Sequence, residues 1–333
     1  MRFILEESSW VWDGADREAY IERIEVLLDR LDVASERGEP YAASRELLEQ
    51  TVLEGKPLGD LLWVCGSALD LPFEVMQRLT AHFNVIRYWD DETEWEAFLA
   101  SIAGREVVSP SASLAHARVA QGSATACLPL PGTWSGPCEV VVGEVKKTVH
   151  FVVDEQSHRA FFRDALEVER ADEGRLEALA PHAFPDLFFI EGVWRGLNQF
   201  EGGYRRVRDD LHRLLSILDD HGAWVFTDKT GRLSREEPDP TDKMPKPVTN
   251  QLTERRFKRW GLDMAPEKPD VRADNKCREA RERKLGGQPL YCEWHYKFEP
   301  HINRAHIHPP VSASGEKLIV AIFCDHLPLP KGG

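Results

Sequence analysis

The 333-residue chain lacks the sequence features of exported and membrane proteins. Its first ten residues, MRFILEESSW, have neither the basic start nor the apolar core of a signal peptide. The longest apolar run, Leu318 to Cys324, is far shorter than the roughly 20 residues that cross a bilayer. The six cysteines are scattered and include no CxxC pair. We therefore expect a cytoplasmic protein with reduced cysteines and no membrane partner.

Several catalytic motifs are also missing. The sequence has no GxxxxGK[ST], no GxGxxG, no GxSxG and no HExxH. It therefore lacks the marks of nucleotide hydrolysis, dinucleotide redox chemistry, serine hydrolysis and zinc-dependent proteolysis.

Charge is distributed unevenly along the chain. Lys and Arg number 42 against 56 Asp and Glu, a net charge of −14, which argues against a protein that coats nucleic acid along its whole length. Residues 251–333 hold 15 basic and 11 acidic residues, a local charge of +4, and five of the 12 His. An acidic body thus carries a basic, His-rich C-terminal segment. Such a segment is typical of a region that handles an anionic partner, although an ordinary solvated surface has the same composition.

The pattern of apolar residues predicts an α+β chain in three regions. Residues 1–105 alternate strand-like and helix-like segments, as in a small α/β domain. Residues 106–230 form a mixed strand and helix region. Residues 104–137, rich in Ser, Ala, Gly and Pro, are typical of a linker or an irregular excursion. Residues 231–333 predict a helix–helix–antiparallel sheet domain. The proline-rich, charged segment 228–250 is the expected boundary before it.

Two local predictions concern where a long helix ends and where a buried strand lies. The leucines of Tyr204 to Asp220 lie on one helical stripe, and Gly222 is expected to end that helix before a strand from Ala223 to Thr227. Leu61 to Cys65 reads as a buried strand.

The C-terminal region predicts three strands in quick succession. Residues 292–299 alternate strictly, so Trp294, Tyr296 and Phe298 should be buried while His295 and Lys297 point to the opposite face. After Pro300, residues 302–308 continue as a second strand. The apolar run 317–324 is typical of a central strand with both faces covered.

Stacked as a meander, the first two strands would place basic and imidazole side chains on one polar face. RNA cleavage by its own 2′-hydroxyl needs a base, an acid and cations, and these side chains supply all three without metal or cofactor. Arg304 and Lys297 are the expected phosphate ligands, and Glu293, Glu299 or the Asp325–His326 pair would assist. The predicted catalytic residues are His295, Lys297, Arg304, His306 and His308.

Two other interpretations of this face remain open. Alternating charged residues are also what a solvated strand carries for solubility. A metal site would use His306 and His308, with His295 or a nearby carboxylate as a third ligand, although the spacing matches no zinc signature.

The stretch CEWHYKFEPHINRAHIHPP, followed by KLIVAIFCDHL, resembles the helix–helix–sheet layout of RelE/HigB-type toxin domains. The resemblance covers about the last 80 residues. It rests on the His-x-Lys strand, the Arg304 and His306 strand, and the closing strand that runs into Asp325. It implies an mRNA endonuclease that acts as the effector of a toxin or anti-phage defence system. Such toxins are small and basic, whereas this chain is long and acidic.

The N-terminal strand suggests a different nuclease chemistry. Phe3 to Ser9, a strand that ends in acids, is similar to the opening of PIN-type metal-dependent nucleases, with Glu6 where that pattern has Asp. Asp70 and the pair Asp90–Asp91 are the candidate partners in binding a divalent cation. Acids at strand ends also serve as helix caps. Gly202-Gly203, followed by Arg205, Arg206 and Arg208, would suit a phosphate or a plain loop-to-helix junction.

The sequence thus favours a cytosolic, metal-independent ribonuclease that works within a complex with a protein partner. The rival is a non-catalytic adaptor or antitoxin-like subunit whose acidic body binds a basic protein. Convergence of the His and Lys side chains on one point would favour catalysis.

Overall fold

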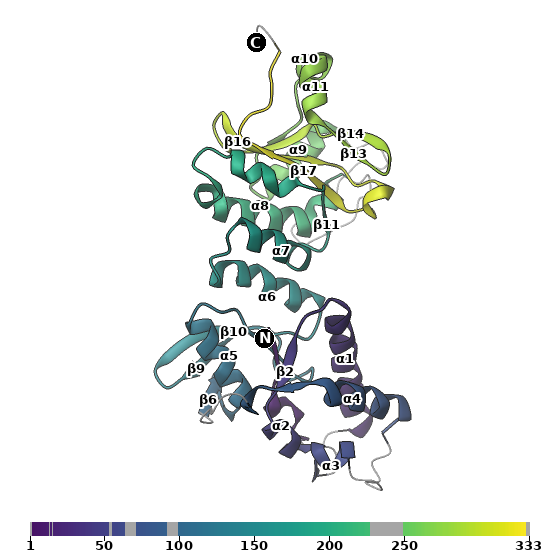
Figure 1. Ribbon diagram of the computed structural model, residues 1–333, viewed down its shortest axis with the longest axis vertical. Helices are drawn as coiled ribbons and strands as arrows, with labels where there is room; N and C mark the ends of the chain where they lie inside the picture. Colours follow the sequence, from purple (N-terminus) through teal and green to yellow (C-terminus); the bar gives the residue numbers. More distant parts are fainter. Residues whose placement is uncertain are drawn as a thin grey trace. The chain divides into compact units, whose positions relative to one another are not determined.

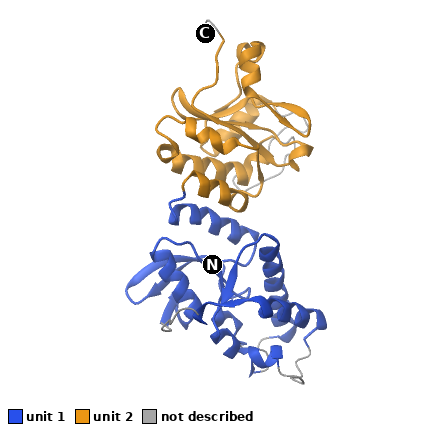
Figure 2. Ribbon diagram, in the orientation of Figure 1, with its two compact units in different colours: residues 1–171 blue, residues 172–333 orange. Residues whose placement is uncertain are grey.

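The computed structural model describes residues 2–12, 14, 16–52, 55–63, 71–91, 99–226 and 249–330. The chain forms two compact units, unit 1 (residues 1–171) and unit 2 (residues 172–333), which Figure 2 colours separately. The mixed α+β fold is confirmed.

This division differs from the three regions expected. The boundary expected after residue 105 falls inside β7 (Arg105–Val108), because Ala103 and Gly104, both at positive φ, form the hairpin turn between two strands of one sheet. Most of the boundary expected at 228–250 lies outside the described residues.

Unit 1 is built on an eight-stranded sheet with the order β5-β2-β1-β8-β10-β9-β6-β7. The strands β5, β2, β1, β8 and β10 run parallel, and β9, β6 and β7 extend the sheet in antiparallel fashion. A separate pair, β3 with β4, is antiparallel. The strands are β1 (Phe3–Leu5), β2 (Tyr41–Ala43), β3 (Thr51–Val52), β4 (Lys56–Pro57), β5 (Arg87–Tyr88), β6 (Leu99–Ile102), β7, β8 (Ala126–Leu128), β9 (Gly136–Val142) and β10 (Val145–Phe151).

The interior strands β1 and β8 of this sheet are fully buried, and Figure 1 shows the helices of unit 1. They are α1 (Arg17–Glu36), α2 (Glu46–Glu49), α3 (Leu58–Trp63), α4 (Phe73–Val85), α5 (Pro110–Ala120) and α6 (Glu155–Val168), with the short 3₁₀ helices η1 (Glu7–Trp10) and η3 (Trp89–Asp91). The segment 104–137 is therefore no linker, because it contributes α5 and the interior strand β8. Its Ser and Ala residues are the small side chains that let α5 lie buried against the sheet. Leu61 lies in α3 rather than in the strand expected there.

Unit 2 contains a five-stranded sheet with the order β11-β17-β16-β15-β12. The strands are β11 (Leu187–Phe189), β12 (Met264–Ala265), β15 (Trp294–Glu299), β16 (Ile302–His308) and β17 (Leu318–Cys324), and a separate hairpin joins β13 (Glu282–Leu285) to β14 (Gln288–Tyr291). The predicted antiparallel meander β15–β16–β17 is confirmed, and every residue of β17 is buried between its neighbours.

The helices of unit 2 are α7 (Glu173–Ala183), α8 (Tyr204–Val225), α9 (Asn250–Arg259), α10 (Pro269–Ala273) and α11 (Asn275–Arg281), with η4 (Val193–Gln199) and η5 (Ser312–Ser314). The leucine stripe of α8 is buried as predicted. The helix continues through Gly222 to Val225, so the strand expected from Ala223 is wrong. Gly222 serves close packing rather than helix termination, because a Cβ there would lie 2.5 Å from Leu318 Cδ2.

One face of the unit 2 sheet carries the aromatic core. Trp294 is buried against Phe226 and Phe257, and Phe323 packs against Trp194 and Phe200. Tyr296 and Phe298 share the face with Trp294 but are only half-buried, because they approach the open tip of the hairpin. The predicted alternation is therefore confirmed, with less burial toward the tip.

Candidate functional site

The register of β15 against β16 brings four of the predicted catalytic residues to one face of the sheet. His295 is paired with His306, and Lys297 with Arg304. Directly opposed residues of antiparallel strands project to the same side, so these four side chains are neighbours. The His295 and His306 rings lie 5.3 Å apart between centroids and are nearly parallel, at 27°.

This face is covered, whereas the sequence predicted a solvent-exposed polar surface. His295 and Arg304 are each 6% exposed and His306 is fully buried, while Lys297 alone of the four stays exposed. In Figure 1, α10 and α11 lie on the opposite side of this sheet from α8. The buried Leu290 and Cys292, from the β13–β14 hairpin and the segment after it, pack with Ile322 and Cys324 of β17. The segment that contains α10, α11 and the β13–β14 hairpin is rich in charged residues. Its sequence therefore did not predict that it would cover this face of the sheet.

His306 is held in one orientation by a backbone contact. Its Nδ1 donates to the carbonyl oxygen of Cys292 at 3.0 Å. Burial first, and then the charges of His295, Arg281 and Arg304, lower the pKa of His306 well below its usual value, so the ring is neutral. With the proton on Nδ1, Nε2 carries a lone pair, and that buried atom has no hydrogen-bond partner.

Glu267 completes the cluster, and sequence reasoning missed it. The pairing of β12 with β15 and the hydrogen bond from Glu267 N to the Glu293 carbonyl bring its carboxylate beneath His295. Glu267 Oε1 lies 3.8 Å from His295 Nδ1. The sequence offered no signal for this contact, because Glu267 lies in a loop 28 residues before His295.

Two guanidinium groups, those of Arg281 and Arg304, lie next to the cluster of Glu267, His295 and His306. Arg281, fully buried, donates from Nε to Glu267 Oε1 at 2.6 Å and from Nη1 to the carbonyls of Cys277 and Pro328. Its Nη2 has no partner, and neither has Nε of Arg304. Buried polar atoms in native proteins are overwhelmingly hydrogen-bonded. Single unpaired atoms also occur elsewhere, as at Arg30 Nε and His150 Nδ1 in unit 1. Here bare donors and a bare lone pair lie close together, which indicates a place for a ligand.

A cavity of about 200 Å³ adjoins this cluster. Ile322 and Cys324, which pair with His306 and Arg304, form part of its lining, together with Arg195 and Arg283. Burial raises the pKa of the Cys324 thiol to about 11, against the lowering effect of the nearby arginines. The Cys324 thiol is thus neutral, and the lining has two arginines against one carboxylate, Glu191, so the cavity has a small excess of positive charge.

Other predicted residues of this region are engaged elsewhere. His308 donates from Nδ1 to the Pro309 carbonyl at 2.8 Å and does not join the cluster. Glu299 Oε2 forms an ion pair with Arg206 Nη2 at 2.6 Å. Arg206 is one of the three arginines that follow Gly202-Gly203, so it too is engaged. Glu293 lies 3.7 Å from Arg272. Asp325 accepts a long hydrogen bond from Asn303 N, and His326 is exposed.

The N-terminal acids form a different arrangement. Glu6 caps η1, accepting from Ser8 N, Ser8 Oγ and Ser9 N. Glu7 accepts from the hydroxyls of Ser109 and Ser111 and from Ser111 N. Burial, reinforced by Glu6, raises the pKa of Glu7 to about 8, so its carboxyl group is largely protonated at neutral pH.

Asp90 accepts from Ser44 Oγ and Arg45 N, and Asp91 pairs with Arg45. Asp70 lies outside the described residues. Within the described part of the chain, Glu6, Asp90 and Asp91 belong to no group of three metal-ligand atoms within 4.8 Å of one another. The N-terminal metal site is therefore not assembled among the residues that the structure describes.

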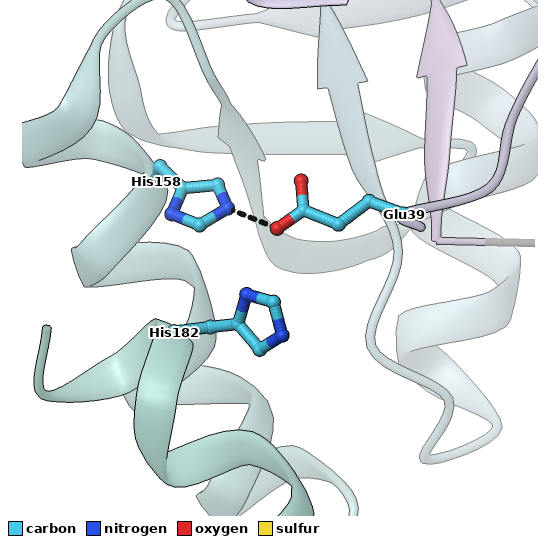
Figure 3. A group of neighbouring side chains, drawn as sticks. All are labelled: Glu39, His158 and His182. Carbon is cyan, nitrogen blue, oxygen red and sulfur yellow. Dashed lines mark hydrogen bonds and ion pairs between the residues drawn. The ribbon is translucent and has the colours of Figure 1, made fainter. Parts of the chain in front are cut away.

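A second buried charge cluster lies in unit 1, where both oxygens of Glu39 are paired and Arg30 Nε has no partner. Glu39 accepts from His158 Nε2 at 2.7 Å, the contact drawn in Figure 3, and its other oxygen accepts from Arg30 at 3.1 Å. Burial lowers the pKa of His158, against the raising effect of Glu39. These contacts tie α1 and the loop before β2 to α6, which is a structural role.

Unit 1 also has a cavity of about 280 Å³ beside the pair His150–Asp164, whose Nε2 and Oδ2 atoms are 2.6 Å apart. Its lining is mostly apolar, with Lys147 as its cation. It is less suited to an anionic ligand than the cavity of unit 2.

A scan of protein-family models and searches of curated proteins and of solved structures found no match to this chain. Among the described residues, no helix has the length and apolar character needed to cross a membrane.

Proposed function

We propose that the chain is a nuclease that binds and cleaves RNA phosphodiesters on the face shared by β15 and β16 in unit 2. The observation that supports this most is Arg304, whose buried Nε has no hydrogen-bond partner although it lies next to His306 on the same strand face. An arginine fork is the group best matched to a phosphate, and here it adjoins an imidazole lone pair.

The exposure of the residues along this face supports a direction of approach. Lys297 is exposed near the hairpin tip, its cross-strand neighbour Arg304 is almost buried, and His306 is fully buried. A phosphate attracted by Lys297 would thus reach Arg304 before the imidazoles. Arg304 and the cavity-lining Arg283 would then offset the charge that develops on the phosphorus centre during cleavage.

The proposed setting is a cytoplasmic toxin or anti-phage defence system. Its first support is the resemblance of the C-terminal residues to RelE/HigB-type domains. Its second is that the five described cysteines are all free thiols, as in a reducing compartment.

The test is cleavage by the purified full-length chain of total RNA and, in parallel, plasmid DNA. We expect wild type to cleave RNA, and Arg304→Ala, His295→Ala and His306→Ala each to lower the rate roughly 10²–10⁴-fold. Lys276→Ala, which removes an exposed cation of α11 outside the cluster, is the matched control and should keep the wild-type rate. Circular dichroism of each variant checks that it is folded.

An unchanged rate in folded Arg304→Ala would overturn the proposal, as would the absence of cleavage of either substrate by wild type. The second result, together with tight binding of a basic protein, would favour the adaptor instead. The observation that favours the adaptor is the net charge of −18 carried by residues 1–250.

A further inference from the structure

We infer that Glu267, His295 and His306 form a binding site for one divalent transition-metal ion, with Zn²⁺ as the best-matched probe. One ligand atom from each residue lies within 4.8 Å of the other two, and the three side chains are buried. The sequence favoured cleavage without metal, and this geometry argues for an ion instead.

His306 has the orientation of a metal-ligating histidine. Such residues almost always donate their second ring N–H to a carbonyl or carboxylate, which fixes the tautomer and aims the other nitrogen at the ion. Here Nδ1 donates to the Cys292 carbonyl at 3.0 Å, and Nε2 is buried without a partner. A histidine kept only for packing would leave that lone pair unsatisfied.

Glu267 and His295 supply the other two ligands. Two ligand atoms bound at about 2.1 Å in tetrahedral geometry lie roughly 3.4 Å apart, close to the 3.8 Å between Glu267 Oε1 and His295 Nδ1. Metal binding would replace the long contact, 3.5 Å, that His295 Nδ1 makes with the Glu293 carbonyl. The hydrogen bond from Arg281 Nε holds the Glu267 carboxylate in place as an outer-shell contact. Two imidazoles and one carboxylate suit zinc, manganese, iron or cobalt rather than calcium, which takes oxygen ligands.

The charge around the cluster points to what completes the site. Arg281 balances Glu267, and Arg304 adds a further positive charge. Three protein ligands leave a coordination position open, and an anion there would offset part of the positive charge of the ion and Arg304. That this anion is a substrate phosphate rests on the proposed function, whereas binding of the ion itself does not.

The experiment is a calorimetric titration of Zn²⁺ into the full-length chain after dialysis against chelator. We expect one equivalent to bind to wild type, and His306→Gln and Glu267→Gln to weaken that binding at least about 100-fold. His308→Gln is the matched control. It lies two residues along the same strand, outside the cluster, and should bind as wild type does.

Because the variants remove buried groups, Co²⁺ added to wild type gives an independent reading. We expect visible ligand-field absorption without a strong near-ultraviolet thiolate band, since the proposed ligands are imidazole and carboxylate. A thiolate band, no binding by folded wild type, or undiminished binding by folded His306→Gln would each overturn the site.

The two proposals can fail separately. Zinc binding without RNA cleavage contradicts the nuclease alone. Cleavage that survives chelation, in a chain that binds no Zn²⁺, contradicts the metal site alone.

Discussion

Both units hold buried nitrogen atoms without a hydrogen-bond partner, and the units differ in how these atoms are grouped. In unit 1 the buried Arg30 and His150 each keep one such nitrogen, and each binds a carboxylate through another nitrogen. In unit 2, Arg281, Arg304 and His306 each keep one, and Arg304 and His306 share one strand face. Paired groups hold a fold together, and unpaired ones are retained at a cost to stability that a ligand can offset. The grouping of unpaired atoms on one strand face is the reason to place the candidate site in unit 2.

The largest expected change in stability comes from Gly196→Ala, which tests how closely η4 packs on β17 beneath the candidate site. A Cβ on Gly196 would lie 2.0 Å from the carbonyl oxygen of Phe323 in β17, and neither backbone can yield cheaply. We expect Gly196→Ala to lower the free energy of unfolding of unit 2 by roughly 4 kcal/mol or more, measured by urea denaturation.

Gly174→Ala is the control for that variant. Its Cβ would meet only Asp172 Oδ1, at an ordinary 3.7 Å, and alanine favours the helix by up to about 1 kcal/mol. Equal stability of the two variants would show that η4 does not press on β17.

A smaller effect is expected in unit 1, where Glu7 makes stability depend on pH. Its folded pKa of about 8 lies above its ordinary value of 4.5, so the folded state binds the proton more tightly. Its contribution to stability is therefore fully present below pH 4.5 and is lost as pH rises toward 8. We expect Glu7→Gln, which cannot lose a proton, to gain on the order of 2–4 kcal/mol over wild type between pH 5 and pH 8.

Urea denaturation at the two pH values measures this difference. Glu25→Gln, at an exposed position of α1, should show no such trend. A difference between Glu7→Gln and wild type that stays constant with pH would mean that Glu7 is ionised in the fold.

The sequence predicted the meander of unit 2 well and its surroundings poorly. Alternation is a local property, so β16 has its predicted bounds and His295 lies opposite in face to Trp294. What covers a face depends on distant segments. Residues 273–285 are rich in charge, yet Arg281 is fully buried, because carbonyls and Glu267 satisfy most of its donors.

The candidate site was predictable to the same extent. Strand pairing brought His295, Lys297, Arg304 and His306 together as expected. His308 is held by a local carbonyl, and Glu267 arrives through the pairing of β12 with β15, a contact between short segments that carries no periodic signal.

Arg304 is the residue whose role, in holding a ligand or in holding the fold, decides whether this face is a binding site. The decisive measurement is the free energy of unfolding of Arg304→Met by urea denaturation, with Arg281→Met as reference. Arg281→Met should lose roughly 3–5 kcal/mol, because it leaves Glu267 buried and unpaired. We predict that Arg304→Met stays within about 1 kcal/mol of wild type or exceeds it, since removing a buried charge that lacks a full set of partners relieves its desolvation. A loss as large as that of Arg281→Met would contradict the account and make Arg304 a structural residue.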